Sequence, residues 1–405
     1  MVEELNPRFD LINPSESHAM LRDMVRDFVE KKVEEQALEH DREEKFNLSL
    51  FRELGELGLL GITVSEDFGG SGLDTISALI VHEELASSDP AFTLSYLAHS
   101  MLTANNLSVN GSEEQKRRFL PGLCSGELVG CMAMSEPDYG TDVMGMKTTA
   151  ELNSDGNWVI NGNKMWITNG SIDDKGTPAD LVWVYAKTGI DESGRPEIST
   201  FLVEKGMDGF SVGQKIYDKS GMRASNTAEL VFDNCIVPSE NLVGSVGGSI
   251  LHMMRNLELE RIALAAMSLG IARRSLKEMN RYASERVSFG KPIREYGQIQ
   301  RHISESYAEF KAMQAYVYNT ARMINLESGG YRLDTDGVKL FSTTAAKNIA
   351  DRAIQVMGGY GYVGEYVVER LWRDSKLLEI GGGTLESHQK NMTKELYKNP
   401  DFIMK

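Results

Sequence analysis

Hydrophobic residues recur at helical spacing through the first third of the chain. From Ser15 to about Gly130, apolar positions repeat every three or four residues, which is the period of an amphipathic helix. Residues 75–88 and 91–109 stay apolar over several turns, so each predicts one apolar helix. The clustered glycines of Asp67–Gly72 predict a loop. Strands and helices do not alternate here, so residues 1–130 are predicted to form an all-helical domain.

The pattern changes at Leu128, where short runs rich in Val, Ile, Thr and aromatic residues begin. Such runs predict strands. They lie at residues 151–168, 181–187, 199–204, 210–212 and 228–231. Ser154–Gly156 and Asn161–Gly162 have turn composition and are expected to separate strands. Residues 131–244 are therefore predicted to form a compact β-domain of barrel or sandwich type.

Long helical patterns return after Gly244. They cover residues 253–285, 296–327, 336–357 and 365–378, with short glycine-rich breaks between them. Four long helices joined by short connections predict a four-helix bundle over residues 245–405. The fold class expected is therefore α+β and multidomain, with a helical domain, a β-barrel-like domain and a helical bundle in that order.

Composition narrows the class of protein. The chain has 405 residues and a net charge of −16, which argues against nucleic acid or an anionic membrane as a partner. Its three cysteines show neither metal-ligand spacing nor a disulfide framework, so we expect no metal site and a reducing compartment. No run of about 18 apolar residues predicts a membrane span. The acidic start lacks an apolar signal core, so a cytoplasmic protein is expected, with a mature organellar protein as the alternative.

The segment Asn256–Met267 carries two glutamates on different faces of one predicted helix. Glu258 and Glu260 point about 200° apart, because successive residues turn by about 100°. Glu258 lies between Arg255 and Arg261, so it can pair on a polar edge. The helical neighbours of Glu260 are instead apolar: Leu257, Ala263, Leu264 and Met267. A carboxylate on an apolar face is costly, and burial raises its pKa towards that of a general base. A solvated glutamate at the helix edge is the alternative, and the pattern leaves both open.

Several loops could hold a ligand. Residues 132–142 combine hydroxyl groups with a Pro-Asp-Tyr-Gly turn that suits a phosphate or a ring edge, although an ordinary β-turn has the same composition. Trp166–Thr168 could bind a planar ligand, although a tryptophan there is more often core. Arg286 could clamp a pyrophosphate or only cap a helix. The Gly-rich bend at 355–359 and the Thr384–Glu386 segment allow close approach of a ligand. The chain lacks a P-loop, HExxH and GxSxG, and its one GxGxxG match, Gly359–Gly364, follows a predicted helix and not the strand that the Rossmann fingerprint requires. A bound dinucleotide would therefore not be held by a Rossmann fold.

Six motifs taken together resemble the acyl-CoA dehydrogenase family over nearly the whole chain. They are Ala133-Met-Ser-Glu-Pro137 with Gly140-Thr-Asp142, Asn161-Gly-Asn-Lys-Met-Trp-Ile-Thr-Asn-Gly170, Gly221-Met-Arg-Ala-Ser-Asn-Thr227, Arg286-Val-Ser-Phe-Gly290, Gln355-Val-Met-Gly-Gly-Tyr-Gly361 and Arg373-Asp-Ser-Lys376. Each motif is moderately specific, and their shared order makes chance resemblance very improbable. The resemblance is greatest to the isovaleryl-CoA, or branched-chain, branch.

The resemblance implies FAD as cofactor. The residues that it assigns to FAD are Met132, Met134, Ser135, Gly140, Thr141, Trp166, Ile167, Thr168, Arg286, Phe289, Gln355, Val356, Gly358, Gly359, Thr384 and Glu386. The members of this set from Arg286 onward would hold the FAD of a neighbouring subunit, so a homo-oligomer is implied, usually a homotetramer. One departure is Gly297, where the family usually has a flavin-contacting Gln. Gln298 is adjacent, which leaves that contact open.

The implied reaction is α,β-dehydrogenation of an acyl-CoA thioester. A glutamate removes the α-proton while the β-hydrogen leaves as hydride to flavin N5, and an electron-transfer flavoprotein then takes the electrons. The FAD ribityl 2′-OH and one backbone N–H would bind the thioester carbonyl. The residues assigned to substrate are Thr141, Leu251, Glu258, Arg261, Gly382 and Gly383.

The catalytic glutamate is displaced relative to most of the family. Most members carry it two residues before the threonine of a Glu-Gly-Thr motif, and here that position is Gly382. The isovaleryl branch places it on the preceding long helix in a Leu-Glu-Arg context, which Glu260 matches. Glu379 and Glu386 are the rival carboxylates. The small Gly382 leaves room beside the substrate α-carbon and favours a branched or bulky acyl group, and a short, cyclic or aryl-substituted one remains open. Ala98-His-Ser100 is likewise similar to the isovaleryl branch.

Two other classes remain as alternatives. A flavin-dependent oxidase on the same fold would reoxidise rapidly with O₂. A non-catalytic acyl-CoA-binding protein would explain the glycine at 382, and Glu260 argues against it. The acyl group, the pathway and the physiological electron acceptor are not determined by the sequence.

Overall fold

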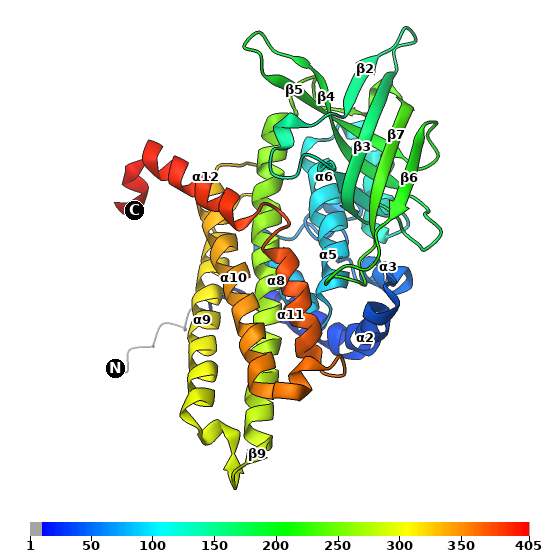
Figure 1. Ribbon diagram of the computed structural model, residues 1–405. Helices are drawn as coiled ribbons and strands as arrows, with labels where there is room; N and C mark the ends of the chain where they lie inside the picture. The colour runs from blue at the N-terminus through cyan, green and yellow to red at the C-terminus, as the bar shows by residue number, and fades with distance from the viewer. Residues whose placement is uncertain (1–9, 405) are drawn as a thin grey trace, which may run out of the picture.

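The computed structural model describes residues 10–404 and arranges them as helices, a β-domain and a second set of helices (Figure 1). The predicted fold class is confirmed. The N-terminal helices are α1 (Glu16–Phe28), η1 (Val29–Val33), α2 (Glu34–Glu43), α3 (Leu48–Glu56), η2 (Glu66–Phe68), α4 (Thr75–Ala86), α5 (Pro90–His99), η3 (Ser100–Asn105), α6 (Asn106–Asn110) and α7 (Glu113–Ser125). The apolar run 91–109 is therefore not one regular helix, because the π-helical turn η3 interrupts it between α5 and α6.

Eight strands form the main sheet of the β-domain. They are β1 (Gly130–Ala133), β2 (Thr149–Leu152), β3 (Trp158–Thr168), β4 (Leu181–Ile190), β5 (Pro196–Glu204), β6 (Phe210–Lys215), β7 (Thr227–Val237) and β8 (Leu242–Val243). Their order is β6-β7-β3-β2-β4-β5-β8, and β1 pairs with β4 in parallel. Two predictions were wrong here. Residues Met132 and Ala133 belong to β1 and not to a loop, and Asn161–Gly162 lies inside β3.

Gly162 is required by packing and not by a turn. It has φ +147° at an irregularity in the β3–β7 pairing, and a Cβ there would lie 2.5 Å from Thr148 Oγ1. The composition of Asn161–Gly162 therefore marks a bulge with close backbone approach, which is the other common use of glycine in a strand.

The bounds of the C-terminal helices differ by several residues from the predicted ones. They are α8 (Ser249–Glu285), α9 (Gly297–Ala321), α10 (Arg332–Met357), α11 (Val367–Leu378) and α12 (Leu385–Lys398), with short 3₁₀ turns η5 (Ser239–Asn241), η6 (Ile293–Glu295), η7 (Gly358–Tyr362) and η8 (Pro400–Met404). The helix predicted to end at residue 327 ends at Ala321, and α12 was not predicted. Two strands of two residues each, β9 (Val287–Ser288) and β10 (Lys291–Pro292), form a hairpin between α8 and α9.

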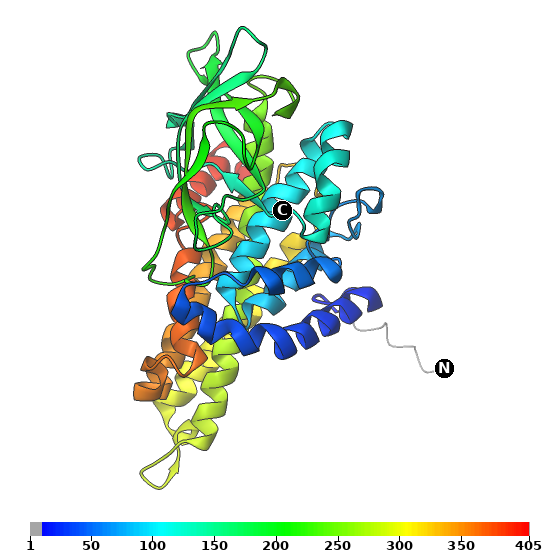
Figure 2. The ribbon, with the colours of Figure 1, turned by 90° about the vertical axis from the view of Figure 1, so that its right-hand side faces the viewer.

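The central element is α8, which has 37 residues and is about 56 Å long at 1.5 Å per residue. It packs against α4, α9, α10 and α11, and its residues 261–272 are all buried. Its first turns lie beside the β-domain, and its last turn reaches the β9–β10 hairpin at the opposite end of the molecule (Figure 1). Figure 2 shows the N-terminal helices packed along the side of the bundle, below the β-domain. One helix therefore connects both ends of the molecule.

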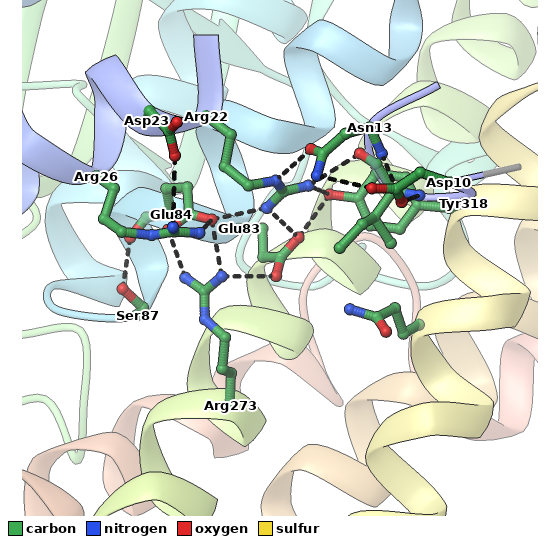
Figure 3. Close-up of polar contacts among 12 residues, drawn as sticks. Asp10, Asn13, Arg22, Asp23, Arg26, Glu83, Glu84, Ser87, Arg273 and Tyr318 are labelled. Atoms are coloured by element: carbon green, nitrogen blue, oxygen red, sulfur yellow. Dashed lines mark hydrogen bonds and ion pairs between the residues drawn. The ribbon is translucent and has the colours of Figure 1, made fainter. Parts of the chain in front are cut away.

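The close contact between α4 and α8 depends on Gly270. A Cβ at this position would lie 2.3 Å from the carbonyl oxygen of Glu83, so no side chain fits. This contact brings Glu83 and Glu84 of α4, both 1% exposed, against Arg273 of α8. Arg22 of α1 completes the group (Figure 3).

This buried charge cluster consists of Arg22, Glu83, Glu84, Arg273 and Tyr318. Arg22 bonds to Glu83 at 3.0 Å and to Glu84 at 2.7 Å, and Arg273 bonds to the same two carboxylates at 2.6–3.0 Å. The Tyr318 hydroxyl accepts from Arg22 and donates to Glu83 at 2.5 Å (Figure 3). The cluster therefore fastens α1 and α4 to α8 and α9. None of its members was identified from the sequence.

Within residues 10–404, no helix combines the length and the apolar character that crossing a bilayer requires.

Candidate active site

Glu260 lies in the fourth turn of α8 beside the turn that connects α11 to α12. A Cβ built on Gly382 would lie 3.3 Å from Glu260 Cδ and 2.6 Å from Leu264 Cδ1. Gly382 also has φ +66°, a conformation that side chains rarely adopt. Gly382, where most of the family has its glutamate, and Glu260, the glutamate of the isovaleryl branch, are therefore in contact. The side chains of Glu260 and Leu264 occupy the space beside Gly382.

This geometry corrects one prediction. The absence of a side chain at Gly382 was expected to leave room for a branched acyl group, but Leu264 and Glu260 occupy that room. The glycine accommodates the glutamate of α8 and gives no information about the acyl group.

The carboxylate of Glu260 is half-buried, and within residues 10–404 it makes no hydrogen bond and no ion pair that meets ordinary distances. Burial raises its pKa, against the attraction of Lys339 and Arg261. A desolvated carboxylate without a hydrogen-bond donor is a stronger base than a solvated one, because neither water nor a donor group stabilises its charge.

Glu258 faces a different environment from the one predicted. Its carboxylate is 4% exposed and accepts from the backbone N–H groups of Gly330 and Tyr331, each at 3.0 Å. The predicted pairing with Arg255 at a polar edge is absent, since Arg255 donates to the carbonyl of Leu326 and the side chains of Asn105 and Asn106. Glu258 therefore fixes the α9–α10 connection to α8.

The turn beside Glu260 is surrounded by charged side chains from three helices. Arg261 of α8 donates to the Gly382 carbonyl at 3.4 Å. Lys339 of α10 and His388 of α12 both donate to the Gly383 carbonyl, His388 at 2.9 Å. Sequence reasoning missed Lys339 and His388, because only the packing of α10 and α12 brings them to this turn.

The loop after β1 is fixed to β3 by a buried ion pair that no sequence pattern predicted. Lys164 bonds to Glu136 at 2.9 Å and to the Met134 carbonyl at 3.0 Å. Glu136 also accepts from the N–H groups of Lys147 and Thr148. Burial lowers the pKa of Lys164 to about 8, against the attraction of Glu136. The pair holds the Met134–Ser135 backbone beside β3, where the Ser135 carbonyl accepts from Met165 N–H at 2.9 Å.

Trp166 is exposed and not part of the core. The residue is 55% exposed, and its backbone has φ +60° at a second irregularity in the β3–β7 pairing. Ile167 is buried and Thr168 half-buried, so this strand end presents Trp166 outward and anchors the next residue. A bulky residue at positive φ is strained, and strain of this kind clusters at ligand-binding sites.

Met132 connects this region to the base. Its sulfur lies 2.8 Å from the amide nitrogen of Asn256, one helical turn before Glu260 on α8. The predicted ring-binding loop and the predicted base are therefore neighbours.

A second region lies at the far end of α8. A cavity of about 650 Å³ is lined by Tyr282, Arg286, Ser288, Ile293, Val356, Met357, Gly358, Gly359, Tyr360, Val363 and Glu365. Four of the predicted cofactor residues belong to it: Arg286, Val356, Gly358 and Gly359. Gly358 and Gly359 have open space where a Cβ would lie, so a ligand can approach their backbone. The aromatic rings of Tyr282 and Tyr360 were not predicted.

The remaining predicted residues lie outside this cavity. Gln355 is exposed on α10, and Phe289 is 95% exposed at the hairpin tip with φ +49°. Thr384 caps α12 and Glu386 is exposed in its first turn. Gly140 and Thr141 are exposed in the loop after β1, and Leu251 is 75% exposed at the start of α8. Gly297 begins α9 with open space around it, and Gln298 is exposed beside it.

Comparison with known proteins agrees with this arrangement. Family models of the acyl-CoA dehydrogenase N-terminal, middle and C-terminal domains match residues 15–127, 131–235 and 250–397. The mitochondrial isovaleryl-CoA dehydrogenase of Solanum tuberosum is 41% identical over 386 residues, covering 95% of this chain and 91% of that protein. That of Pongo abelii is 42% identical over 388 residues, covering 94% and 89%.

Solved structures agree as well. Butyryl-CoA dehydrogenase from Megasphaera elsdenii superposes with a TM-score of 0.89 at 34% identity, covering 95% of this chain and 98% of that one. An acyl-CoA dehydrogenase of Bacillus anthracis complexed with FAD gives a TM-score of 0.87 at 31% identity, covering 95% and 68%. The chain belongs to the acyl-CoA dehydrogenase family, a family of FAD-dependent oxidoreductases.

The residues present fit FAD on physical grounds. Trp166 offers an exposed aromatic face beside the half-buried hydroxyl of Thr168, which suits a planar ring with polar edges. The far cavity combines a guanidinium, two unobstructed glycines and two tyrosine rings, which suits a pyrophosphate with an attached adenosine.

Proposed function

We propose that this chain removes two hydrogens from the α,β-bond of a short or branched acyl-CoA thioester, with Glu260 as the proton acceptor. The observation that carries the proposal is the position of Glu260: it is half-buried, without a hydrogen bond among the described residues, and packed against Gly382. A carboxylate in such a position is retained at a cost in stability, which function explains.

Glu260 would take the α-proton of the thioester. Its raised pKa favours proton uptake, and the absence of competing donors leaves its oxygens available. When bound, FAD supplies the acceptor for the β-hydrogen. The enolate-like charge that develops on the thioester oxygen needs a donor, and the Gly382 N–H makes no hydrogen bond to any described residue. Arg261 and Lys339 hold the carbonyls of this turn, which orients that N–H.

We also propose that the FAD-binding residues come from two subunits. Met132, Met134, Ser135, Trp166 and Thr168 would border the ring. Glu260 and Arg286 are 26 positions apart along α8 and its C-cap, about 39 Å, which is beyond the reach of one dinucleotide. The cavity at Arg286 would therefore hold the pyrophosphate and adenosine of an FAD whose ring lies in a neighbouring copy, and a homotetramer satisfies this arrangement.

The substrate class rests on the relatives. Besides the isovaleryl-CoA dehydrogenases, a 2-methylacyl-CoA dehydrogenase of Solanum tuberosum is 38% identical over 387 residues, covering 95% of this chain and 91% of that protein. These names support a short branched acyl group. Cyclic and aryl-substituted groups are the alternatives that a substrate panel would separate.

An electron-transfer flavoprotein is the electron acceptor that we propose. A flavin-dependent oxidase on the same fold is the second candidate. Slow reoxidation of the reduced protein by O₂ supports the first, and rapid reoxidation supports the second.

The test replaces Glu260 with Gln. Glu260→Gln should keep its bound FAD and lose at least about a thousandfold in the rate at which acyl-CoA bleaches the flavin absorbance without oxygen. Glu379→Gln is the matched control, because Glu379 is a buried carboxylate near the same turn that pairs with Lys376 at 2.7 Å. It should bleach normally.

Normal bleaching by Glu260→Gln, with loss in Glu379→Gln or Glu386→Gln, overturns the assignment. A panel of isovaleryl-, isobutyryl-, 2-methylbutyryl-, butyryl-, cyclic and aryl-substituted acyl-CoAs then ranks the substrates. Preference for long straight chains contradicts the proposed substrate class.

A further inference from the structure

Lys339 is a buried lysine that bonds to no carboxylate among the described residues. Its side chain is fully buried on α10, and its ammonium donates to the Gly383 carbonyl. Burying a charged ammonium is costly, and a carbonyl alone compensates for it poorly. A lysine in this position therefore needs a further explanation.

The other charges around this turn are already matched. Asp336 of α10, fully buried, lies 3.1 Å from Arg261 and 2.6 Å from His388, and Arg332 lies 3.7 Å from it. Glu379, at the end of α11, pairs with Lys376. Both ring nitrogens of His388 face acceptor oxygens, on Asp336 and on Gly383.

Around this turn, within residues 10–404, two groups remain without a matched charge: Lys339 and Glu260. They lie on α10 and α8, which pack against each other, and both reach the Gly382–Gly383 turn. The remaining titratable group facing Glu260 is Tyr185 of β4, which is buried and carries no charge in its ordinary form. Two cations act on Glu260, and Arg261 already pairs with Asp336, so Lys339 is the one whose charge no carboxylate among residues 10–404 matches.

We propose that Lys339 is a positioning residue for the base: it fixes the Gly382–Gly383 turn against Glu260 and supplies charge that keeps Glu260 ionised in a partly buried site. This inference rests on the proposed function, because it assigns Lys339 to act through Glu260. The lysine does not touch substrate, since its side chain has no exposed surface.

The electrostatics agree with the geometry. Burial lowers the pKa of Lys339 to about 7, against the attraction of Glu260. Burial raises the pKa of Glu260, and Lys339 is the first group that opposes this rise. Two buried groups coupled in this way titrate as a pair, so removing one charge shifts the titration of the other.

The experiment separates the charge of Lys339 from its hydrogen bond. Lys339→Gln keeps a donor for the Gly383 carbonyl and removes the charge, while Lys339→Met removes both. In the holoenzyme, each should move the acid limb of the flavin-bleaching rate to higher pH by about one unit or more, because Glu260 is then protonated more easily. At a pH on the acid side of this limb, the rate should fall about tenfold relative to the unmodified protein.

Two further measurements distinguish this role from a structural one. The infrared carboxyl band that disappears in Glu260→Gln should persist to higher pH in Lys339→Gln. Lys347→Met is the matched control, because Lys347 lies on the same helix, half-buried, eight residues further from the turn. It should leave the limb unchanged.

An unchanged acid limb and an unchanged infrared titration in both Lys339 variants overturn the inference. Equal slowing at every pH, with a lower melting temperature and no shift, also overturns it, because that result describes a structural role. If Glu260→Gln itself bleaches normally, the proposed function fails first, and the two failures are therefore distinguishable.

Discussion

Two of the places where the protein buries charge are built in opposite ways. At the junction of α1, α4, α8 and α9, Glu83 and Glu84 accept bonds from Arg22 and Arg273, and all four carboxylate oxygens have a partner (Figure 3). At the turn before α12, Glu260 has no hydrogen bond among residues 10–404, and Lys339 bonds only to a carbonyl there. Where every buried carboxylate oxygen has a partner, the charged side chains hold the helices together. Incomplete pairing leaves a group that can still react.

The pKa values of Glu84 and Glu260 differ in the same way as their hydrogen bonding. Burial alone would raise the pKa of Glu84, but the bonds from Arg273 and the charge of Arg22 outweigh it and lower that pKa to about 2. Burial prevails at Glu260, where the pKa is raised. The same residue type on two packed helices therefore has opposite shifts, and the number of donors around each carboxylate decides the sign.

The largest effect on stability is expected from removing a cation of the buried charge cluster. Arg273→Met leaves Glu83 and Glu84 with fewer donors in a buried site, and should cost about 3–5 kcal/mol in the free energy of unfolding. Chemical denaturation measures this. Arg281→Met is the control, because Arg281 pairs with Glu278 at the surface of the same helix and should cost less than about 1 kcal/mol. Equal losses in the two variants would contradict the structural role of the cluster.

The second effect is the pH dependence of the stability that Glu84 contributes. Because the pKa of Glu84 is lowered from 4.5 to about 2, its contribution is fully present above pH 4.5 and is lost as the pH falls towards 2. The shift corresponds to about 3 kcal/mol. The difference in stability between the unmodified protein and Glu84→Gln should therefore be largest near pH 6 and shrink below pH 4.5. A difference that does not change with pH would mean that the carboxylate is not held ionised by its partners.

The smallest expected effect is a gain in folding stability, where the two variants above lose it. Glu260→Gln makes the same isosteric change at the incompletely paired site, and it should stabilise the fold by about 1 kcal/mol near pH 8, since the folded state no longer holds an unbonded carboxylate. The sign follows from the raised pKa: the folded state disfavours the ionised form, so stability falls as the pH rises above the ordinary pKa of 4.5, and the loss is complete above the folded pKa. A variant that melts below the unmodified protein would show that Glu260 contributes to structure.

The sequence predicted what depends on neighbours along the chain. Helical and strand periodicities indicated the order of the three regions, and the apolar neighbours of Glu260 were enough to mark it as unusual. Where packing interrupts regularity, prediction failed. The bulge at Gly162, the π-helical turn η3 and the early end of α9 belong to this kind.

The charge clusters could not be predicted for a different reason. Arg22, Glu84, Arg273 and Tyr318 are far apart in sequence and meet only when four helices pack. Lys339 and His388 reach the Gly383 carbonyl in the same way, from α10 and from a helix that the pattern did not reveal. A charged residue on a helix is usually solvated, so no single position in these clusters differs in sequence from a surface residue.

The length of α8 has a consequence for how the protein can vary. Glu260 and the cavity at Arg286 are joined by one uninterrupted helix, so inserting or deleting a single residue between them would turn one end by about 100° relative to the other. If the two ends serve different FAD molecules, as proposed, that rotation misaligns the sites of two subunits at once. The segment between residues 260 and 286 should therefore accept substitutions at its surface and reject every change of length.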